Sequence, residues 1–240
     1  MLNNIAIILI DTSHPGNIGA AARAMKNMGI HDLRLVNPVT LQWEEAIARS
    51  AGAEDILNQA KIYEEMNLAI ADCSLVIGTS ARSRSFHWPL LSIHEDAEKI
   101  LHQAKTTKVA IVFGRESSGL TNEELQRCQY HLTIPVTEIY SSLNLAAAVQ
   151  IICYELYKTN ITLTPDSESL PIKAIASHNE LEKLYQHLEK SCIEVKFLNP
   201  HKPGLLMARF RKLFNRCELT KVELNILRGF LSAILKRKSL

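Results

Sequence analysis

Short runs of consecutive apolar residues, each followed by a helical pattern, constrain the fold of this chain more than any other feature. The run at 5–10, Ile-Ala-Ile-Ile-Leu-Ile, has no polar position, so it predicts a strand buried on both faces of a sheet. Similar runs occur at 75–78 and 109–113, and a second short strand that includes Arg34 is predicted at 33–36. Strands and helices alternate in this way from residue 5 to 158. The pattern predicts an α/β fold with a mostly parallel sheet and helices on both faces.

The segments between these runs carry helical spacing. Gly29 is placed to end the first of these helices, because glycine readily adopts the left-handed conformation after a last turn. The pattern 43–57 contains Ala-Gly-Ala at its centre, which weakens the helix prediction there. The predicted helices cover residues 18–28, 43–57, 63–71 and 93–104.

The chain changes character after residue 158. Residues 159–176 include Thr-Pro-Asp-Ser-Glu-Ser and no sustained period, which predicts a linker. Residues 177–240 then predict a small domain of three amphipathic helices, two of which begin with capping boxes, Ser177 to Glu180 and Thr220 to Glu223. The apolar positions of the three helices are Leu181, Leu184, Tyr185 and Leu188; Leu206, Phe210, Leu213 and Phe214; and Leu224, Leu227, Phe230, Leu231 and Ile234. The sequence therefore divides into 1–158, 159–176 and 177–240.

Charge is unevenly distributed between these parts. The whole chain carries a formal charge of +2, but residues 202–240 contain ten Lys and Arg against Glu218 and Glu223. That segment therefore carries +8, and the rest of the chain carries −6 by difference. A basic C-terminal segment on an acidic body favours a polyanionic partner such as RNA. Ordinary solvated helix faces with a charged tail are the alternative.

The remaining composition describes an ordinary globular protein, with 47% hydrophobic and 22% charged residues. The apolar start lacks a basic leader and ends at Asp11, so it predicts a strand and neither a signal peptide nor a membrane span. The five cysteines form no C-x-x-C pair and have no histidine at ligand spacing. We therefore expect reduced thiols, no metal site and a cytoplasmic location.

Residues 134–149 form the most distinctive stretch. Ile134 ends an apolar strand at Pro135, a polar loop follows, and Asn144 opens a helix that begins Leu-Ala-Ala-Ala-Val. A strand, an oxygen-rich loop and a helix N-terminus predict a ligand site at the carboxyl end of a parallel sheet. The three alanines allow close approach of another backbone, so we expect a homodimer that uses the helix from Asn144 to Leu156.

Two further segments complete a family pattern. They are Asn-Ile-Gly-Ala-Ala-Ala-Arg at 17–23 and Phe-Gly-Arg-Glu at 113–116, the latter followed by Gly119 and Leu120. With Ile-Pro at 134–135 and Ser-Ser-Leu-Asn-Leu at 141–145, they resemble, in order, the three motifs of the SPOUT methyltransferases in their TrmH-like class. The motifs span about the first two thirds of the chain. Its length and basic tail resemble the TrmJ branch of that class, which are tRNA ribose 2′-O-methyltransferases.

The loops that follow three of the predicted strands offer backbone hydrogen-bonding groups and apolar side chains but no cluster of lysines. Such a lining suits a ligand with an adenine and a thioether better than a triphosphate. The resemblance implies that this ligand is S-adenosyl-L-methionine, bound at a C-terminal trefoil knot of the first domain. It also implies 2′-O-methylation of cytidine or uridine at position 32 of a tRNA anticodon loop. The expected cofactor-binding residues are Thr79, Ser80, Ala81, Gly114, Glu116, Ile134, Ser141, Ser142 and Leu143.

The expected catalytic residues are Arg23, Ser142 and Asn144. The family proposal makes Arg23 the base that accepts the ribose proton; the alternative is that Arg23 only orients a phosphate and polarises the hydroxyl. The segment 82–89 combines arginines, hydroxyls and aromatics, which suits phosphate and base contacts, although a plain surface loop is also possible. The expected RNA-binding residues are Asn17, Arg82, Arg84, Arg115, Arg209, Arg211, Lys212 and Arg216.

Two other functions remain open at this point. A non-catalytic RNA-binding protein of the same fold is the first, although Arg23, Glu116, Ser142 and Asn144 argue against it. A SPOUT enzyme that methylates a base nitrogen is the second, and the segment 17–23 argues against that.

Overall fold

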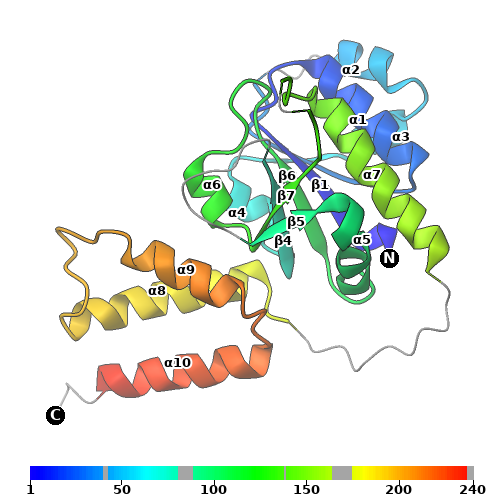
Figure 1. Ribbon diagram of the computed structural model, residues 1–240. Coiled ribbons are helices and arrows are strands. Elements are labelled where there is room, and N and C mark those ends of the chain that lie inside the picture. The colour runs from blue at the N-terminus through cyan, green and yellow to red at the C-terminus, as the bar shows by residue number, and fades with distance from the viewer. Residues whose placement is uncertain (40–42, 81–88, 138, 164–174, 237–240) are drawn as a thin grey trace.

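The computed structural model describes residues 1–39, 43–80, 89–137, 139–163 and 175–236. An α/β domain is followed by a separate unit of three helices (Figure 1). The predicted fold class is confirmed in these terms. The trefoil knot stays a prediction.

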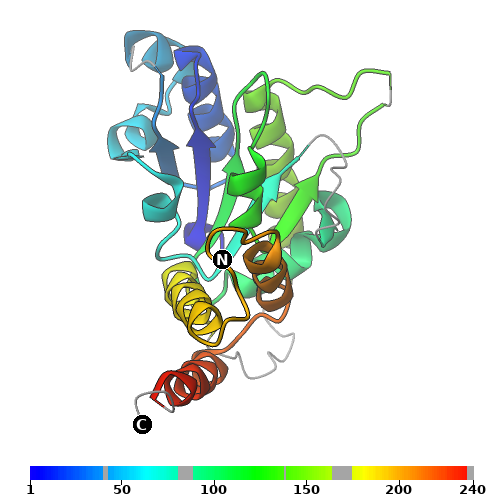
Figure 2. The same ribbon diagram turned by 90° about the vertical axis from the view of Figure 1, so that its left-hand side faces the viewer.

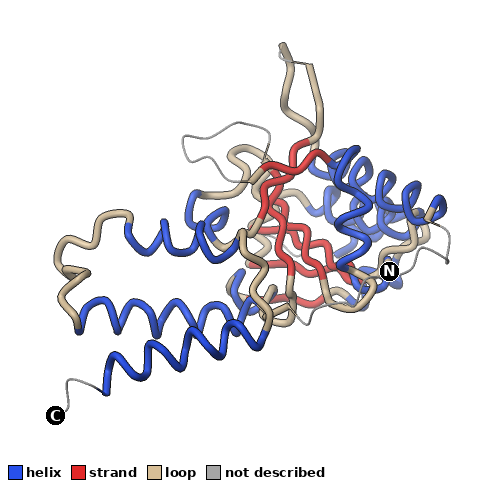
Figure 3. The backbone as a smooth tube through the Cα atoms, turned by 60° about the horizontal axis from the view of Figure 1, so that its bottom comes forward, coloured by secondary structure: helices blue, strands red, loops and turns tan. Residues whose placement is uncertain are grey.

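The sheet has seven strands in the order β3-β2-β1-β6-β4-β7-β5, and every neighbouring pair is parallel. The central strands are the continuous apolar runs, which are buried on both faces. Figure 3 shows the strands side by side with helices packed around them. The strands are β1 (Ile5–Ile10), β2 (Asp32–Val36), β3 (Lys61–Tyr63), β4 (Leu75–Thr79), β5 (Leu90–Ser92), β6 (Val109–Phe113) and β7 (Tyr130–Thr133).

Helices cover both faces of the sheet, because alternate side chains of each strand point to opposite sides. In β1, Ile5, Ile7 and Leu9 pack with α1 (Pro15–Asn27), α5 (Ile93–Gln103) and α7 (Leu145–Thr162). Ile8 and Ile10 pack on the other face, against α4 (Met66–Ala69) and α6 (Asn122–Gln126). A 3-10 turn, η1 (Leu2–Asn4), precedes β1. The fully apolar run is therefore explained by burial on both faces.

Two predicted helices differ from the structure. The pattern 43–57 is two helices, α2 (Trp43–Ser50) and α3 (Glu54–Gln59), because Ala51 and Gly52 take positive φ angles of 44° and 96° between them. The helix expected over 63–71 is wrong in its first part. Tyr63 ends the edge strand β3, and only Met66–Ala69 forms a helix.

Helix α1 begins three residues before its predicted start. Pro15 occupies the first helical position, which needs no backbone N–H donor, and His14 caps the helix. At the other end, Gly29 follows the C-cap with φ of 68°, so its role as terminator is confirmed.

Helix α7 runs to Thr162, so the domain boundary expected at residue 158 falls inside a helix. The C-terminal unit consists of α8 (His178–Glu194), α9 (Leu206–Asn215) and α10 (Lys221–Lys236). Both predicted capping boxes form, at Ser177 and at Thr220. Most predicted apolar positions share one small core, but Phe230 is 65% exposed.

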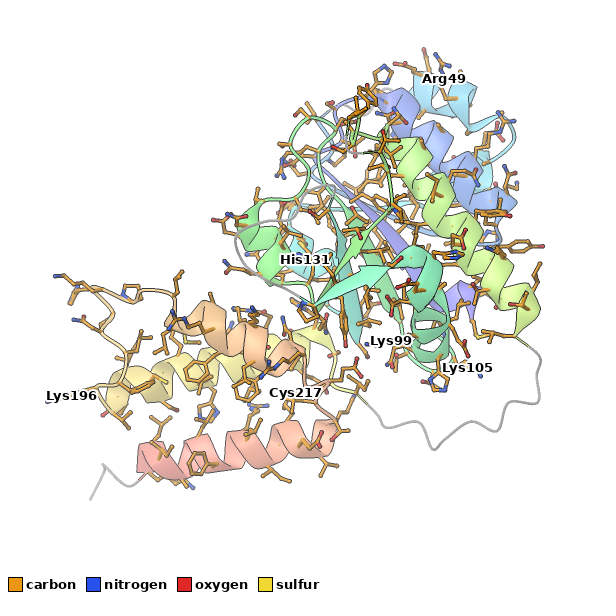
Figure 4. All side chains as sticks on the ribbon, viewed as in Figure 1. Arg49, Lys99, Lys105, His131, Lys196 and Cys217 are labelled. Atoms are coloured by element: carbon orange, nitrogen blue, oxygen red, sulfur yellow. The ribbon has the colours of Figure 1, made fainter. Side chains whose placement is uncertain are left out.

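The C-terminal unit packs against the amino edge of the sheet. The strand arrows point away from it in Figure 2. The N–H of His178 donates to the carbonyl of Cys73, and Asn215 Nδ2 donates to the carbonyl of Cys128, just before β4 and β7. The Tyr130 hydroxyl donates to Glu218 and accepts from Lys99, which Figure 4 places on the side of α5 that faces this unit. The carboxyl edge of the sheet is left uncovered by this unit.

None of the helices formed by the described residues is both long enough and apolar enough to cross a membrane.

Candidate active site

A cavity of about 450 Å³ lies at the carboxyl edge of the sheet. It is formed by the ends of β4 and β6, the loop 114–120, the loop after β7 and the start of α7. Its apolar walls include Leu120, Leu132 and Leu145. Eight of the nine expected cofactor-binding residues line it: Thr79, Ser80, Gly114, Glu116, Ile134, Ser141, Ser142 and Leu143. The ninth, Ala81, lies outside the described residues, as do Arg82 and Arg84.

The loop 114–120 folds back tightly on itself beside this cavity. The N–H of Arg115 donates to the carbonyl of Gly119 at 3.2 Å, and the N–H of Gly119 donates back at 2.9 Å. A Cβ atom on Gly114 would lie 2.1 Å from the carbonyl carbon of Gly119, so only glycine fits there. Gly119 itself has φ of 69°. The two glycines of this motif therefore serve the turn of the loop.

Arg115, expected to contact RNA, is occupied by carboxylates of its own chain. Its guanidinium donates to both oxygens of Glu124, at 3.0 and 3.1 Å, and also to Asp11. The hydrogen bonds to Glu124 raise the pKa of Arg115. Arg115 therefore leaves the cavity without an uncompensated cation of its own, which suits a ligand that is not a polyphosphate.

Glu116, in the second sequence motif, forms hydrogen bonds with the first motif and with the loop that precedes it. Its carboxylate accepts hydrogen bonds from the N–H and Oγ of Ser13 at 3.2 and 3.1 Å, and from the N–H of His14 at 3.4 Å. It also accepts one from Nδ2 of Asn17 at 3.0 Å. Burial by itself would raise the pKa of Glu116, but the hydrogen bonds from Asn17 and Ser13 lower it. Glu116 is therefore a carboxylate that fixes the loop between β1 and α1.

Asn144 joins the third motif to the other two. Its Oδ1 accepts from the N–H groups of Ala146 and Ala147, so it caps α7 as predicted. Its Nδ2 donates to Oδ1 of Asn17 at 3.0 Å. Glu116, Asn17 and Asn144 thus form one continuous chain of hydrogen bonds, which we call the Glu116–Asn17–Asn144 chain. It connects the cavity to the first turns of α1 and α7.

Arg23 lies on the exposed side of α1, three residues before Lys26. Gly19, four residues before Arg23, brings α1 against helix α2. A Cβ atom on Gly19 would lie 2.0 Å from the carbonyl oxygen of Ala46. The close contact therefore fixes α1, and with it Arg23, against another part of the same domain.

The expected RNA-binding residues of the C-terminal unit differ in their availability. Arg209 on α9 and Arg216 at the C-cap of that helix are exposed, and Lys212 is half-buried between them. Arg211 instead pairs with Glu182 through both guanidinium nitrogens and lies 4.5 Å from the ring centroid of Tyr185. Arg211 therefore contributes to the packing of α8 and α9.

Sequence reasoning missed Ser13 and His14. Both lie in the loop that Glu116 fixes, and neither belongs to the motifs that drew attention. The described residues contain no cluster of three or more His, Cys, Asp or Glu side chains that could bind a metal ion.

The parallel sheet and the cavity at its carboxyl edge define an α/β protein with its candidate ligand site where such folds carry theirs. Residues 4–154 match the SpoU rRNA Methylase family, and residues 179–240 match the C-terminal domain of the tRNA methyltransferase TrmJ. The chain belongs to the SpoU methylase family and is an RNA methyltransferase of its TrmJ branch. The resemblance seen in the three motifs is thereby confirmed.

Curated relatives match over nearly the whole chain. The tRNA (cytidine/uridine/adenosine-2′-O-)-methyltransferase TrmJ of Pseudomonas aeruginosa is 47% identical, covering 97% of this chain and 94% of its own length. The tRNA (cytidine/uridine-2′-O-)-methyltransferase TrmJ of Cronobacter sakazakii is also 47% identical, covering 98% and 97%.

Solved structures agree with this assignment. The crystal structure of TrmJ from Z. mobilis has a TM-score of 0.83 at 32% identity and covers 95% of this chain and 98% of its own. The SpoU methyltransferase AviRb from Streptomyces viridochromogenes, solved in complex with AdoMet, has a TM-score of 0.52 at 22% identity. It covers 66% of this chain and 61% of its own, and the likeness shows the fold alone.

Proposed function

We propose that this chain transfers a methyl group from S-adenosylmethionine to the 2′-hydroxyl of a tRNA ribose, at a cytidine or uridine in position 32. The main support is the hydrogen-bonded Glu116–Asn17–Asn144 chain. It connects the cavity, which is large enough for the cofactor, to the helix that carries Arg23. The names of the relatives support the tRNA substrate and the 2′-O position. A tRNA substrate implies that the reaction takes place in the cytoplasm.

The residues around the cavity fit S-adenosylmethionine. Its volume falls within the usual range for small-ligand sites. Leu120, Ile134 and Leu143 offer apolar contact for an adenine, and the hydroxyls of Ser141 and Ser142 offer polar contact for its ribose and amino acid parts. The bound cofactor supplies an electrophilic methyl group on a sulfonium.

The protein must position a ribose oxygen and remove its proton. A bond forms between the 2′-oxygen and the methyl carbon while the carbon–sulfur bond breaks, and the hydroxyl proton passes to a base or to solvent. Arg23 is exposed on α1 and carries the positive charge that would orient the neighbouring phosphate. Asn17 and Asn144 fix the start of α1 relative to the cavity.

Activity with purified protein tests this proposal directly. Arg23→Ala should abolish methyl transfer while leaving S-adenosylmethionine affinity within a few-fold, because Arg23 is not among the residues that line the cavity. Arg49→Ala is the matched control, since Arg49 is also an exposed arginine on an adjacent helix. Nucleoside mass spectrometry of tRNA from cells lacking the protein should show loss of one 2′-O-methylated pyrimidine. An unchanged nucleoside profile would reject the substrate.

We also propose a homodimer that uses the outer side of α7. The alanines serve partly within the chain, since Ala148 packs against the domain core while Ala147 is exposed. Tyr154, Tyr157 and Ile161 extend the exposed side at helical spacing, with Tyr154 49% and Ile161 65% exposed. Exposed apolar side chains in a row along a helix are typical of a protein–protein interface. This row therefore supports a second copy of the chain as the partner that covers it.

Sedimentation tests the dimer. The unmodified chain should sediment as a dimer at micromolar concentration, and Tyr154→Glu should sediment as a monomer. Phe230→Glu is the control, because it places the same charge on another exposed aromatic position, on α10. A monomeric and fully active parent chain would exclude the dimer.

A further inference from the structure

His14 combines high exposure with a fixed ring position beside the proposed substrate site. Its side chain is 59% exposed, and its backbone N–H donates to Glu116, whose carboxylate also accepts from Asn17. No sequence motif includes it. Two contacts at Gly16 and one from Glu45 of α2 surround its ring.

The first contact settles which ring nitrogen carries the proton. Nδ1 of His14 accepts a hydrogen bond from the N–H of Gly16 at 3.0 Å and so caps α1. A nitrogen that accepts a hydrogen bond carries no proton, so the proton of the neutral ring is on Nε2. Among the described residues, no hydrogen-bond partner of Nε2 is found.

The second contact is the close packing of the ring on the start of the helix. A Cβ atom on Gly16 would lie 3.0 Å from both Cε1 and Nδ1 of His14. The absence of a side chain at Gly16 therefore gives the ring its place. An imidazole that is packed in this way loses little further entropy when its free N–H binds a ligand.

The third contact comes from α2. Oε1 of Glu45 lies 3.6 Å from Nδ1 of His14, on a helix that Gly19 brings against α1. Glu45 and Glu116 are the two carboxylates that face the His14 residue. Their negative charge makes the surroundings of the ring unfavourable for a further anion unless a hydrogen-bond donor meets that anion directly.

We propose that His14 is a substrate-positioning residue, whose Nε2–H donates a hydrogen bond to a phosphate oxygen of the RNA beside the target ribose. This inference rests on the proposed function, because it takes RNA as the substrate. The ring acts through Nε2–H as a donor, because Nδ1 is already engaged as the acceptor of the Gly16 N–H. A base role would require Nδ1 to take a proton, which would cost the cap on α1.

A pair of substitutions separates the donor from the cap. His14→Ser keeps a side-chain oxygen that can cap α1 but removes the exposed N–H. His14→Ala removes both. For His14→Ser we expect the melting temperature and the S-adenosylmethionine affinity to match the unmodified protein, while KM for tRNA rises roughly tenfold or more, the usual effect of losing a hydrogen bond to a charged group. His14→Ala should show the same rise in KM and also a lower melting temperature.

Other outcomes would overturn the inference. Unchanged tRNA kinetics in His14→Ser, together with destabilisation in His14→Ala, would mean that His14 is only a cap. Weaker cofactor binding in both variants would mean that it acts through the cavity. Salt dependence gives a further test: the slope of log affinity should stay unchanged in His14→Ser, whereas loss of an imidazolium–phosphate contact would reduce it by about one unit. Methyl transfer to tRNA by the unmodified protein is measured in the same assay, so failure of the proposed function would be recognised separately.

Discussion

Asn17 and Asn144 lie 127 positions apart in the chain, yet Nδ2 of Asn144 donates a hydrogen bond of 3.0 Å to Oδ1 of Asn17. Asn17 uses its own Nδ2 for Glu116 at the same time. One small amide therefore links the first, second and third motifs of the family. A change at either partner should affect the geometry of the reaction more than the stability of the fold.

Replacing Asn144 with aspartate tests this link. The carboxylate can still accept from Ala146 and Ala147, and its charge is favourable at a helix N-terminus, so we expect the free energy of unfolding to change by less than about 0.5 kcal/mol. It cannot donate to Asn17, so kcat/KM for tRNA should fall roughly tenfold or more. Steady-state kinetics and urea unfolding measure the two effects. Full activity in Asn144→Asp would show that the amide donor is not needed.

The contact between α1 and α2 leads to a prediction about Gly19. A methyl group there would meet the carbonyl oxygen of Ala46 at 2.0 Å, so Gly19→Ala should destabilise the domain by about 3 kcal/mol or more. Gly229→Ala in α10 is the matched control, because nothing lies within 4 Å of its added Cβ atom. That variant should gain about 0.5–1 kcal/mol from helix propensity. Equal effects of the two substitutions in urea unfolding would contradict the tight contact.

The arginines of α9 should separate into two groups. A double variant with alanine at both Arg209 and Arg216 should show a slope of log RNA affinity against log salt concentration that is smaller by about 2, if each arginine contacts one phosphate. Arg211→Ala should instead lower the stability of the C-terminal unit by about 2 kcal/mol, because it removes both guanidinium hydrogen bonds to the carboxylate of Glu182. Filter binding at several salt concentrations and thermal unfolding distinguish the groups. A salt slope that changes equally for Arg211→Ala would place all three arginines on the RNA.

His178 predicts a loss of stability in mild acid. Burial lowers its pKa to about 4, with a smaller contribution from Arg211 and Arg127 and an opposing one from Glu182. The folded protein therefore holds the neutral ring, while the unfolded chain takes up a proton below about pH 6.5. Stability is complete above that value and declines as the pH falls toward 4, by about 2 kcal/mol between pH 7 and pH 5.

Chemical unfolding at a series of pH values measures this decline. His178→Gln should flatten the dependence, because the substituted side chain does not titrate. The effect should be greatest for the docking of the C-terminal unit, since the N–H of His178 donates to Cys73 of the α/β domain. A decline of equal steepness in His178→Gln would assign it to another group.

The sequence predicted those parts of the fold whose signals are local. Ile5–Ile10 and Val109–Phe113 were predicted with their observed bounds, because a continuous apolar run marks a strand buried on both faces. The edge strands Lys61–Tyr63 and Leu90–Ser92 were missed, since three residues show no period and their formation depends on neighbouring strands. The break at Ala51 and Gly52 was visible only as a weak helix position.

The position of the site was predicted from the sequence, but the hydrogen-bond partners of its residues were not. The loops that line the cavity follow from the rule that parallel strands end at one edge, and eight expected residues lie there. The partners of Glu116 could not be read from the sequence, because Ser13, His14 and Asn17 are about a hundred positions away. The same is true of Arg115 and Arg211, whose charges looked available in the sequence and are paired within the fold.

The C-terminal unit lies at the amino edge of the sheet, whereas the cavity lies at the carboxyl edge. The strand β6 between them spans about 16 Å at ~3.3 Å per residue, and the packed loops add to that separation. An RNA that touches α9 and presents a ribose to the cavity of the same subunit must bridge this distance. The length of the strands would then set the minimum distance that the substrate has to span. If the proposed substrate contacts both places, a hairpin too short to reach both ends would bind at one of them only, and the overall shape of a tRNA would contribute to its recognition.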